Sequence, residues 1–376
     1  MAEPGARIVS LSLRDFRNFE RLEMDFPSEG LAVVGDNGQG KTNLLEAAYY
    51  LSLLRSVRGA RDTDVVRFDT DGFFIDARVC VPDAHEISIG FERAGRRKRV
   101  RRDGAVVDRL SDALGTLPAV MFSPTDVELV SGAPSARRRF FDIMLALSSR
   151  GYLQALQRYR AALERRNAAL RDAARTGAHG ATSAVDVWEP PLAEHGATLI
   201  RARRAWVKQV SARFAERCAA IGERGEIELR YETNVNPNAE SVEQMLADAL
   251  AAKRPTDVRY GLTHVGPHRD DLRLSLDGRE LREFGSAGQQ RTAAFALRTL
   301  EAETLRDARG ASPVFLLDDP FAELDAGRAA RVLGLLRDVG LGQTVLAVPR
   351  DSDIPKELTT LPRCRVERGR ILSLSR

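Results

Sequence analysis

Residues 31–48 read LAVVGDNGQGKTNLLEAA, and this stretch decides the fold. The apolar run LAVV predicts a buried strand, and the apolar spacing after Thr42 predicts a helix with one buried face. Between them, the pattern G-x-x-x-x-G-K-[ST] is filled by Gly35, Gly40, Lys41 and Thr42. A glycine-rich turn between a strand and a helix directs backbone N–H groups and the helix dipole at a phosphate. The stretch therefore predicts a nucleotide-binding P-loop.

The predicted nucleotide contacts are consecutive: Gly35, Asp36, Asn37, Gly38, Gln39, Gly40, Lys41, Thr42 and Asn43. In this motif the lysine reaches the outer phosphates, and the threonine hydroxyl takes a Mg²⁺ ligand position. We therefore expect ATP and Mg²⁺ as cofactors, with Lys41 assisting catalysis and Thr42 binding the metal.

A second stretch, PVFLLDDPFAELD at 313–325, predicts a strand that ends in two carboxylates. These would lie at the sheet edge that carries the P-loop. We expect Asp318 to hold Mg²⁺, directly or through water. Asp319 is expected to orient or deprotonate the attacking water, as phosphoryl transfer requires. The alternative is a strand that ends in a solvated acidic turn.

A third stretch, FGSAGQQR at 284–291, places a serine and two glycines at the start of a predicted helix. This arrangement predicts another cradle for anionic oxygens. One nucleotide already has its cradle at 35–42, so a second cradle makes sense if it covers the γ-phosphate of a nucleotide held by another subunit. A two-fold homodimer that closes on ATP and opens on hydrolysis follows from this reasoning.

The composition fits a folded chain in a reducing compartment. The 376 residues are 43% hydrophobic and 29% charged, with a formal net charge of +4. Cys80, Cys218 and Cys364 are too few and too scattered for a disulfide framework. We expect no secretory signal and no membrane span, because no apolar run approaches the ~20 residues that a span needs. The expected location is the cytoplasm.

Hydrophobic periodicity predicts an α/β fold interrupted by helices. Strand-like runs dominate as far as residue 108, and helical spacing then runs from Pro134 to about Arg175 and again from Trp188 to Ile221. Two apolar stripes joined by a short loop predict an antiparallel helical hairpin. The α/β pattern returns after about residue 256. We expect a discontinuous ATPase head at 1–133 and 256–376, with an inserted helical arm at 134–255.

Six motifs occur in an order that resembles one protein family. They are FRNF at 16–19, GDNGQGKTNLLEA, FSPTDVELVSGAPSARRRFFD, GPHRDDL at 266–272, FGSAGQQR and FLLDDPFAELD. Together they resemble bacterial RecF, a recombination mediator related to the ATPase heads of Rad50 and SMC proteins. The resemblance implies an ABC-type head with weak, DNA-stimulated ATPase activity that dimerises with ATP on duplex or gapped DNA. It also implies action with RecR and RecO to load RecA at single-strand gaps, and a link to the SOS response.

The resemblance also assigns roles by position. It places Lys41 and Thr42 in Walker A and Asp318 and Asp319 in Walker B. It places Ser286, Gly288 and Gln289 in the signature motif that acts in trans, and Asp325 in the D-loop. One departure is Pro349, which stands in LAVPRDSD where such proteins usually carry a Thr or His near the γ-phosphate. Slow hydrolysis is consistent with this departure.

The stretch ERAGRRKRVRRDG suggests a DNA contact. Its candidates are Arg96, Arg97, Lys98, Arg99, Arg101 and Arg102. Alternation on a hairpin would place about half of them on one face, which is enough for salt-dependent phosphate contacts. The alternative is a charged edge hairpin that resists aggregation. We expect no aromatic residue among these charges, which favours duplex backbone contacts over base stacking.

Two other basic clusters have local explanations. Arg137 to Arg139 open a predicted helix and indicate a partner or a structural ion pair, whereas Arg201, Arg203 and Arg204 are expected on a solvated helix face. His264 and His268 flank Gly266 and Pro267, so no regular helix can direct them at a zinc ion, and we expect a structural turn instead.

Other functions remain as alternatives. The nucleotide motifs also occur in ATPase subunits of ABC transporters, but FRNF, GPHRDDL and the helical arm argue against that class. A larger SMC-like structural ATPase would need a much longer helical insertion than the one between Thr42 and Ser286. A nuclease is disfavoured, because no separate cluster of metal-binding carboxylates is visible.

Overall fold

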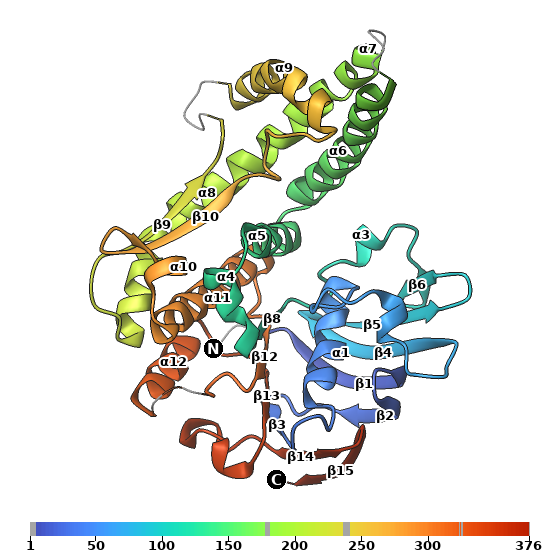
Figure 1. Cartoon of the computed structure of the whole chain (residues 1–376). Helices are drawn as coiled ribbons and strands as arrows, with labels where there is room; N and C mark the ends of the chain where they lie inside the picture. The colour runs from blue at the N-terminus through green and yellow to red at the C-terminus, as the bar shows by residue number, and fades with distance from the viewer. Residues whose placement is uncertain (1–4, 177–180, 236–240, 323, 325, 376) are drawn as a thin grey trace. The chain divides into compact units, whose positions relative to one another are not determined.

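The computed structural model describes residues 5–176, 181–235, 241–322, 324 and 326–375, and the chain divides into two compact units (Figure 1). Within the described residues, unit 1 comprises the chain up to Asp126, residues 220–223 and the chain from Ala294 onward. Unit 2 comprises Val127–Ala219 and Arg224–Ala293. The second unit therefore extends further along the chain than the arm predicted at 134–255.

Unit 1 contains a mainly parallel sheet with the strand order β15-β14-β3-β13-β12-β8. Its strands are β3 (Gly30–Val34), β8 (Ala119–Phe122), β12 (Val314–Asp318), β13 (Thr344–Val348), β14 (Arg363–Glu367) and β15 (Arg370–Ser375). Only β15 runs antiparallel to its neighbour. Every residue of β3, β12 and β13 is buried, as expected for central strands covered on both faces.

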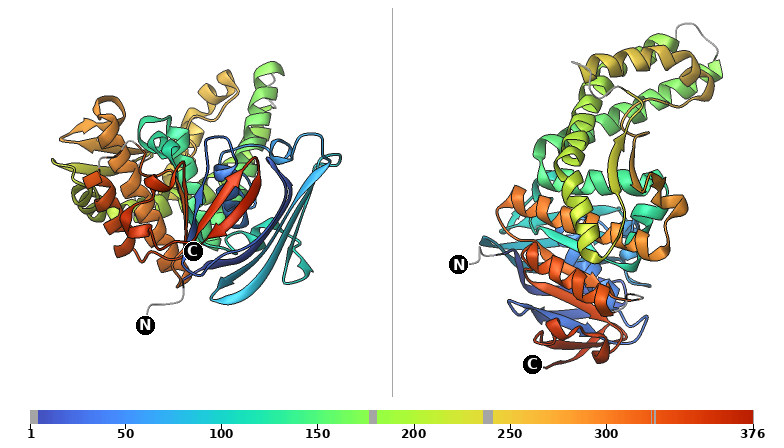
Figure 2. Two further views of the ribbon diagram at one scale, coloured as in Figure 1. Left: turned by 90° about the horizontal axis from the view of Figure 1, so that it is seen from below. Right: turned by 90° about the vertical axis from the view of Figure 1, so that its left-hand side faces the viewer.

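A second sheet of unit 1 is antiparallel, with the order β2-β1-β4-β5-β6-β7. Its strands are β1 (Arg7–Phe16), β2 (Phe19–Asp25), β4 (Gly72–Val81), β5 (Asp83–Glu92), β6 (Arg97–Arg102) and β7 (Ala105–Val106). Figure 2 (left) shows its long strands bending together as one curved sheet. Side chains alternate between a buried and an open face. A register shift between Ile8 and Ser10 buries Ile8 in place of Val9.

Helix α1 (Lys41–Leu53) contacts both sheets of unit 1 and carries the P-loop at its N-terminus. Its side chains from Leu44 to Leu53 are all buried, so a small movement of this helix would disturb both sheets. Helices α2 (Asp62–Val65), α3 (Leu110–Ala113) and α12 (Ala326–Asp338) also lie in this unit, and most of α11 (Ala287–Arg309) belongs to it. Short 3₁₀ turns occur at Pro124–Val127, Asp351–Asp353 and Lys356–Leu358.

Unit 2 is mostly helical, with one small sheet. Its helices are α4 (Glu128–Ser131), α5 (Pro134–Ser148), α6 (Arg150–Thr176), α7 (Ala181–Asp186), α8 (Glu189–Ile221, all but its last two residues), α9 (Val242–Tyr260) and α10 (Leu281–Phe284). The sheet has the order β11-β10-β9, formed by β9 (Ile227–Glu232), β10 (Asp271–Leu276) and β11 (Arg279–Glu280). In the described part of the chain, no helix is long and apolar enough to span a membrane.

Helices α6 and α8 form the predicted antiparallel hairpin. The Arg203 guanidinium of α8 donates to the Tyr152 hydroxyl of α6, and the Arg166 guanidinium of α6 donates to Glu189 of α8. The start of each helix therefore lies beside the later part of the other, so the two helices run antiparallel. Midway between these pairs, a Cβ on Gly196 would lie 3.1 Å from the Tyr159 ring.

The prediction of a solvated face at Arg201–Arg204 is wrong for Arg203, which is 2% exposed. It lies on the buried stripe that carries Leu199 and Trp206, at helical spacing from both.

Candidate nucleotide and nucleic-acid sites

The P-loop connects β3 to α1 with a backbone that its glycines make possible. Gly38 and Gly40 have φ angles of 80° and 121°, which side chains other than glycine rarely adopt. A Cβ on Gly40 would also lie 2.7 Å from the Asn18 amide nitrogen. The φ angle therefore favours glycine at both positions and the space requires it at Gly40, and the resulting turn has the form of an anion nest.

Lys41 lies inside this loop. It is 7% exposed, and its Nζ donates to the carbonyl oxygens of Gly35 at 2.5 Å and Asp36 at 2.9 Å. Burial lowers the pKa of the Lys41 ammonium, while the carboxylates of Asp318 and Asp319 oppose that shift. An incoming phosphate would offer this ammonium a formal negative charge in place of two carbonyl dipoles.

The P-loop and the end of β12 meet at Thr42. Its hydroxyl donates to the two carboxylate oxygens of Asp318 at 2.9 and 3.1 Å, across 276 positions of sequence. Parallel pairing of β3 with β13 and of β13 with β12 brings these two strand ends together. The Asp318 carboxyl is 9% exposed, and burial raises its pKa.

This donor set fits Mg²⁺, because a hydroxyl and a carboxylate are hard oxygen ligands and a cation would relieve the burial of the Asp318 charge. Among the described residues, no group of three or more His, Cys, Asp or Glu side chains forms a separate metal site. Asp319 follows with a left-handed φ of 44°, and its N–H donates to the Ala347 carbonyl at 2.8 Å. The strand therefore ends abruptly at the two carboxylates that the sequence predicts.

Two turns from other parts of unit 1 brace the P-loop. The Asn18 amide donates to the Gln39 carbonyl at 3.0 Å and accepts from the Asn43 amide at 2.8 Å. The Arg368 N–H donates to the Gln39 side chain at 2.8 Å. Gln39 and Asn43 thus have structural bonds within the loop in addition to their predicted nucleotide role. The sequence does not predict this bracing role of Asn18, although Asn18 lies in the FRNF motif.

A buried ion cluster joins the segment after β8 to helix α11. Arg298 of α11 donates to Asp126 at 2.7 Å and to Glu301 at 2.6 Å, and the Glu301 side chain is fully buried. Asp126 also accepts from the Ser123 N–H at 2.9 Å. The segment after β8 is therefore tied to helix α11 by charge pairs. Periodicity gave no signal for this contact, because it joins residues 172 positions apart.

The signature segment belongs to unit 2 up to Ala293. The Ser286 hydroxyl accepts from the Gln289 N–H at 3.3 Å, and the Ser286 N–H donates to the Gln289 side chain at 2.9 Å. This reciprocal pair caps helix α11 at its exposed N-terminus. Beside it, Phe284 is 67% exposed. Asp325, predicted in the D-loop, lies outside the described residues.

Strand β6 divides its basic residues between two faces. Arg97, Arg99 and Arg101 are exposed on one face. On the other face Val100 is buried, and Lys98 donates to Asp62 at 2.6 Å and to the Leu54 carbonyl at 2.7 Å. Lys98 is thus occupied inside unit 1. Of the other candidates, Arg96 lies in the turn before β6 with a φ of 46°, and Arg102 lies 3.6 Å from Asp103.

An aromatic ring lies among these arginines, contrary to the sequence-based expectation. The cross-strand register places Arg14, Phe74, Gly90 and Arg99 in one row across β1, β4, β5 and β6. Phe74 is 44% exposed, and the Arg14 guanidinium lies 4.6 Å from the centre of its ring. Gly90 leaves room for the ring, since a Cβ there would lie 2.8 Å from it. Register, rather than linear spacing, brings these residues together.

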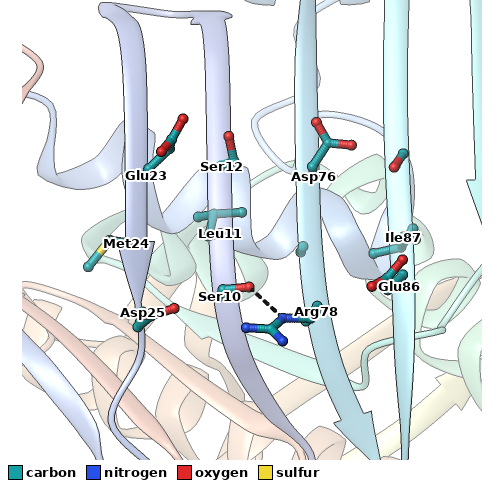
Figure 3. A pocket seen from close by; sticks show the side chains of 12 residues that line it. Ser10, Leu11, Ser12, Glu23, Met24, Asp25, Asp76, Arg78, Glu86 and Ile87 are labelled. Carbon is teal, nitrogen blue, oxygen red and sulfur yellow. Dashed lines mark hydrogen bonds between the residues drawn. The ribbon is translucent and has the colours of Figure 1, made fainter.

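The open face of the antiparallel sheet carries charges of both signs. A groove of about 1070 Å³ runs along it and is lined by Arg14, Phe74, Arg97, Arg99 and Arg101, with several acidic residues. Toward β2 the face is acidic. Figure 3 shows Glu23, Ser12 and Asp76 in a row across three strands, with Arg78 donating to Ser10 below them. The β6 end presents three alternate arginines together, of which Arg97 lies 2.9 Å from Glu92.

His264 and His268 of unit 2 lie in the predicted structural turn. The His268 Nε2–H donates to the Thr263 carbonyl at 3.0 Å, so Nδ1 of the neutral ring accepts from the Tyr159 hydroxyl at 2.6 Å. Burial lowers the pKa of His268 to about 4, and Arg269 and Arg138 act in the same direction. His264 instead contacts Asp257 at 2.7 Å.

This fold and this site define a P-loop ATPase head of the SMC type, and comparison with known proteins agrees. The family model RecF/RecN/SMC N terminal domain matches residues 7–353. The DNA replication and repair protein RecF of Frankia alni is 36% identical, over 98% of this chain and 100% of that protein. A solved structure of the recombination mediator protein RecF with ATP has a TM-score of 0.90 and 27% identity, over 100% of this chain and 99% of that one. An Smc head domain from Pyrococcus furiosus, at 16% identity and a TM-score of 0.56, shares the fold.

The chain therefore belongs to the RecF family of DNA replication and repair proteins.

Proposed function

We propose that this chain is an ATP-controlled DNA-binding protein of recombinational repair and replication restart. The observation that carries the proposal is the Thr42–Asp318 bond, because it joins the P-loop and the end of β12 into one oxygen-rich site. ATP would lie on the loop from Gly35 to Asn43, with Lys41 at its outer phosphates. Thr42 and Asp318 would hold Mg²⁺, which neutralises phosphate charge when bound. The RecF relative solved with ATP supports the nucleotide.

Hydrolysis would be weak, stimulated by DNA, and used as a switch. Asp319 would orient or deprotonate the attacking water, since it directly follows Asp318, the proposed Mg²⁺ ligand. Pro349 follows β13 without a side-chain donor, which is consistent with slow turnover. Lys41 would stabilise the charge that develops on the transferred phosphoryl group.

The signature segment would complete the site of a second copy. Ser286, Gly288 and Gln289 lie at the exposed N-terminus of a helix of 23 residues, where backbone N–H groups and the helix dipole favour an anion. We assign these residues to the γ-phosphate held by the partner subunit, with Asp325 in the D-loop. ATP would then hold two copies together, and its hydrolysis would release them.

Duplex DNA would contact the β6 end of the open sheet face. Arg97, Arg99 and Arg101 project together, and phosphate contacts of this kind give salt-dependent binding without sequence preference. Gapped duplexes and junctions of single and double strand are the proposed substrates. On them the dimer would act in the cytoplasm with RecR and RecO to load RecA, linked to the SOS response. The RecF protein solved with ATP is described as a mediator in the RecFOR pathway, and this supports the proposed partners.

The mass of the protein in solution tests the switch. Wild type, Lys41→Met and Ser286→Arg are measured with ATP, with ADP and without nucleotide, in the presence and absence of gapped duplex DNA. We expect a dimer only for wild type with ATP. Lys41→Met should fail because it does not retain ATP, whereas Ser286→Arg should bind ATP and stay monomeric. If the wild-type protein bound ATP and still remained a monomer, both with and without DNA, this result would contradict the trans site.

A further inference from the structure

A pocket of about 270 Å³ lies within unit 2, apart from the nucleotide and β6 residues. Helices α5, α6 and α8 and the turn at Pro267–His268 line it. The floor is formed by the buried side chains of Leu156, Tyr159 and Leu199, which are between 0% and 6% exposed. Arg160 has a side chain that is 54% exposed and lies at the rim. We call this cavity the arginine pocket.

The arginine pocket carries an excess of positive charge. Four arginines line it, at positions 138, 139, 160 and 203, against the single carboxylate of Asp142. That carboxylate is shared, since Arg203 donates to it at 2.8 Å and Arg160 at 2.7 Å. His268 adds no charge at neutral pH, because its pKa is lowered to about 4.

Arg138 is the arginine best placed to bind a further anion. It donates to the Asp270 backbone carbonyl at 2.9 Å, whereas its neighbour Arg137 takes the Asp271 carboxylate at 2.7 Å. Burial lowers its pKa, and Arg203 and Arg269 act in the same direction, while the nearby carboxylates of Asp271 and Asp270 oppose the shift. A half-buried guanidinium that bonds only a backbone carbonyl gains more from a directly bonded carboxylate than an exposed arginine would.

The size and floor of the pocket restrict the ligand. At about 270 Å³ it falls below the range of ~300–1,000 Å³ typical of small-molecule sites. The half-buried Leu163 extends the apolar floor toward the rim. A phosphate group is charged and would not cover the leucines of the floor. An apolar side chain next to a carboxylate would instead cover the floor and pair with the arginines.

We propose that the arginine pocket binds an acidic segment of a partner protein, with one apolar side chain on the floor and a neighbouring carboxylate on Arg138. Arg203 is a positioning residue in this site. All three of its nitrogens are already bonded, to Tyr152, Asp142 and the Pro267 carbonyl, and it holds Asp142 away from the incoming carboxylate. Arg160 contributes long-range attraction from the rim.

Fluorescence anisotropy of a labelled, end-blocked peptide Gly-Asp-Asp-Phe-Asp-Gly tests the proposal. We expect saturable binding to the full chain at low salt, weakened about tenfold by Arg138→Glu. Arg158→Glu makes the same charge change at an exposed position of α6 outside the pocket lining and should alter binding less than about twofold. Peptides with serine for phenylalanine, or with asparagine for the aspartates, should each bind about tenfold more weakly.

Leu163→Asn provides a second variant that changes the floor without changing the charge. It should weaken the peptide about as much as Arg138→Glu, and the fluorescence of Trp206, which is 4% exposed in unit 2, shows whether each variant is folded. Equal effects of Arg138→Glu and Arg158→Glu would overturn the proposal. So would a 20-base-pair duplex that displaces the peptide and itself loses affinity in Arg138→Glu, because the pocket would then be a DNA contact.

Discussion

The arginines of strand β6 and those of the unit 2 helices occur in similar sequence clusters but have opposite environments. On β6, Arg97, Arg99 and Arg101 are exposed to solvent. In unit 2, Arg166 is 0% exposed and Arg203 is 2% exposed, and both are paired with buried carboxylates. The composition of a cluster therefore does not decide whether its charges face solvent.

Periodicity explains the difference. On a strand, every second side chain faces the same way, so a run such as RKRVRR projects half of its charges outward. On a helix, a residue is buried when it lies three or four positions from apolar neighbours. Arg166 lies between Leu163 and Leu170 at that spacing, and Arg203 between Leu199 and Trp206. The exposed set should respond to salt, and the buried set should govern stability and its pH dependence.

The largest expected effect is that of Arg166→Met. This change leaves Asp257, which is 0% exposed, and Glu189 without the guanidinium that bonds them at 2.7 and 2.9 Å. Breaking a buried pair from one side typically costs ~3–5 kcal/mol. We expect a loss of that size in the free energy of unfolding of unit 2. Both tryptophans, Trp188 and Trp206, lie in this unit, so urea denaturation followed by their fluorescence reports on it.

Arg175→Met is the matched control for this experiment. Arg175 lies on the same helix, and its pair with Asp172 has side chains that are 79% and 68% exposed. Exposed pairs contribute little, so its midpoint should shift by the equivalent of less than ~1 kcal/mol. If both variants unfolded at the wild-type midpoint, burial would not distinguish the two kinds of arginine.

The next effect concerns pH and two neighbours with opposite shifts. Burial raises the pKa of Asp270 from 3.8 to about 6, although its bond from Tyr231 opposes the shift. Folding therefore takes up a proton between those values, and the free energy of unfolding increases as pH falls from 6 to 4. His268 has its pKa lowered from 6.5 to about 4, so the unfolded chain binds more protons in that window and stability decreases.

Single variants should separate the two contributions, which are each worth ~3 kcal/mol at about 1.4 kcal/mol per pKa unit. Asp270→Asn should be more acid-sensitive than wild type between pH 6.5 and 4, and His268→Gln should be less so. Urea midpoints of the three proteins at half-unit pH steps measure this difference. Parallel curves would mean that neither group changes its protonation on folding.

Sequence predicts the elements of the nucleotide site because each is a local pattern. The P-loop lies in one strand–turn–helix unit, and Asp318 and Asp319 end an unbroken apolar strand, so their meeting at Thr42 follows from parallel topology. Asn18 and the row from Arg14 to Arg99 were missed because bracing turns and cross-strand register depend on distant parts of the chain. Arg203 could have been recognised, since the apolar stripe that contains it is visible in the sequence.

A smaller effect is expected from replacing Arg97, Arg99 and Arg101 together by serine. If each neutralises one phosphate, the slope of log Kobs against log salt should become less steep by ~3, since each contact contributes about 0.9. Affinity for a 30-base-pair duplex should fall at low salt, and unit 2 should unfold at the wild-type urea concentration. The measurement is DNA anisotropy between 50 and 200 mM salt. An unchanged slope would exclude β6 from the DNA contact.

The smallest effect is expected from Lys98→Met. This variant tests whether the two faces of β6 have different roles, just as the exposed arginines of β6 differ from the buried arginines of unit 2. Lys98 is 12% exposed at its side chain and is bonded to Asp62 and the Leu54 carbonyl, so it should support folding rather than bind phosphate. Methionine keeps the apolar stem, and we expect a cost of ~1–2 kcal/mol for the lost bonds. Hydrogen exchange in residues 41–53 of α1 should quicken, while the salt slope for DNA stays that of wild type. A slope reduced by about 1 with unchanged exchange would instead place Lys98 at the phosphates and remove the distinction between the faces.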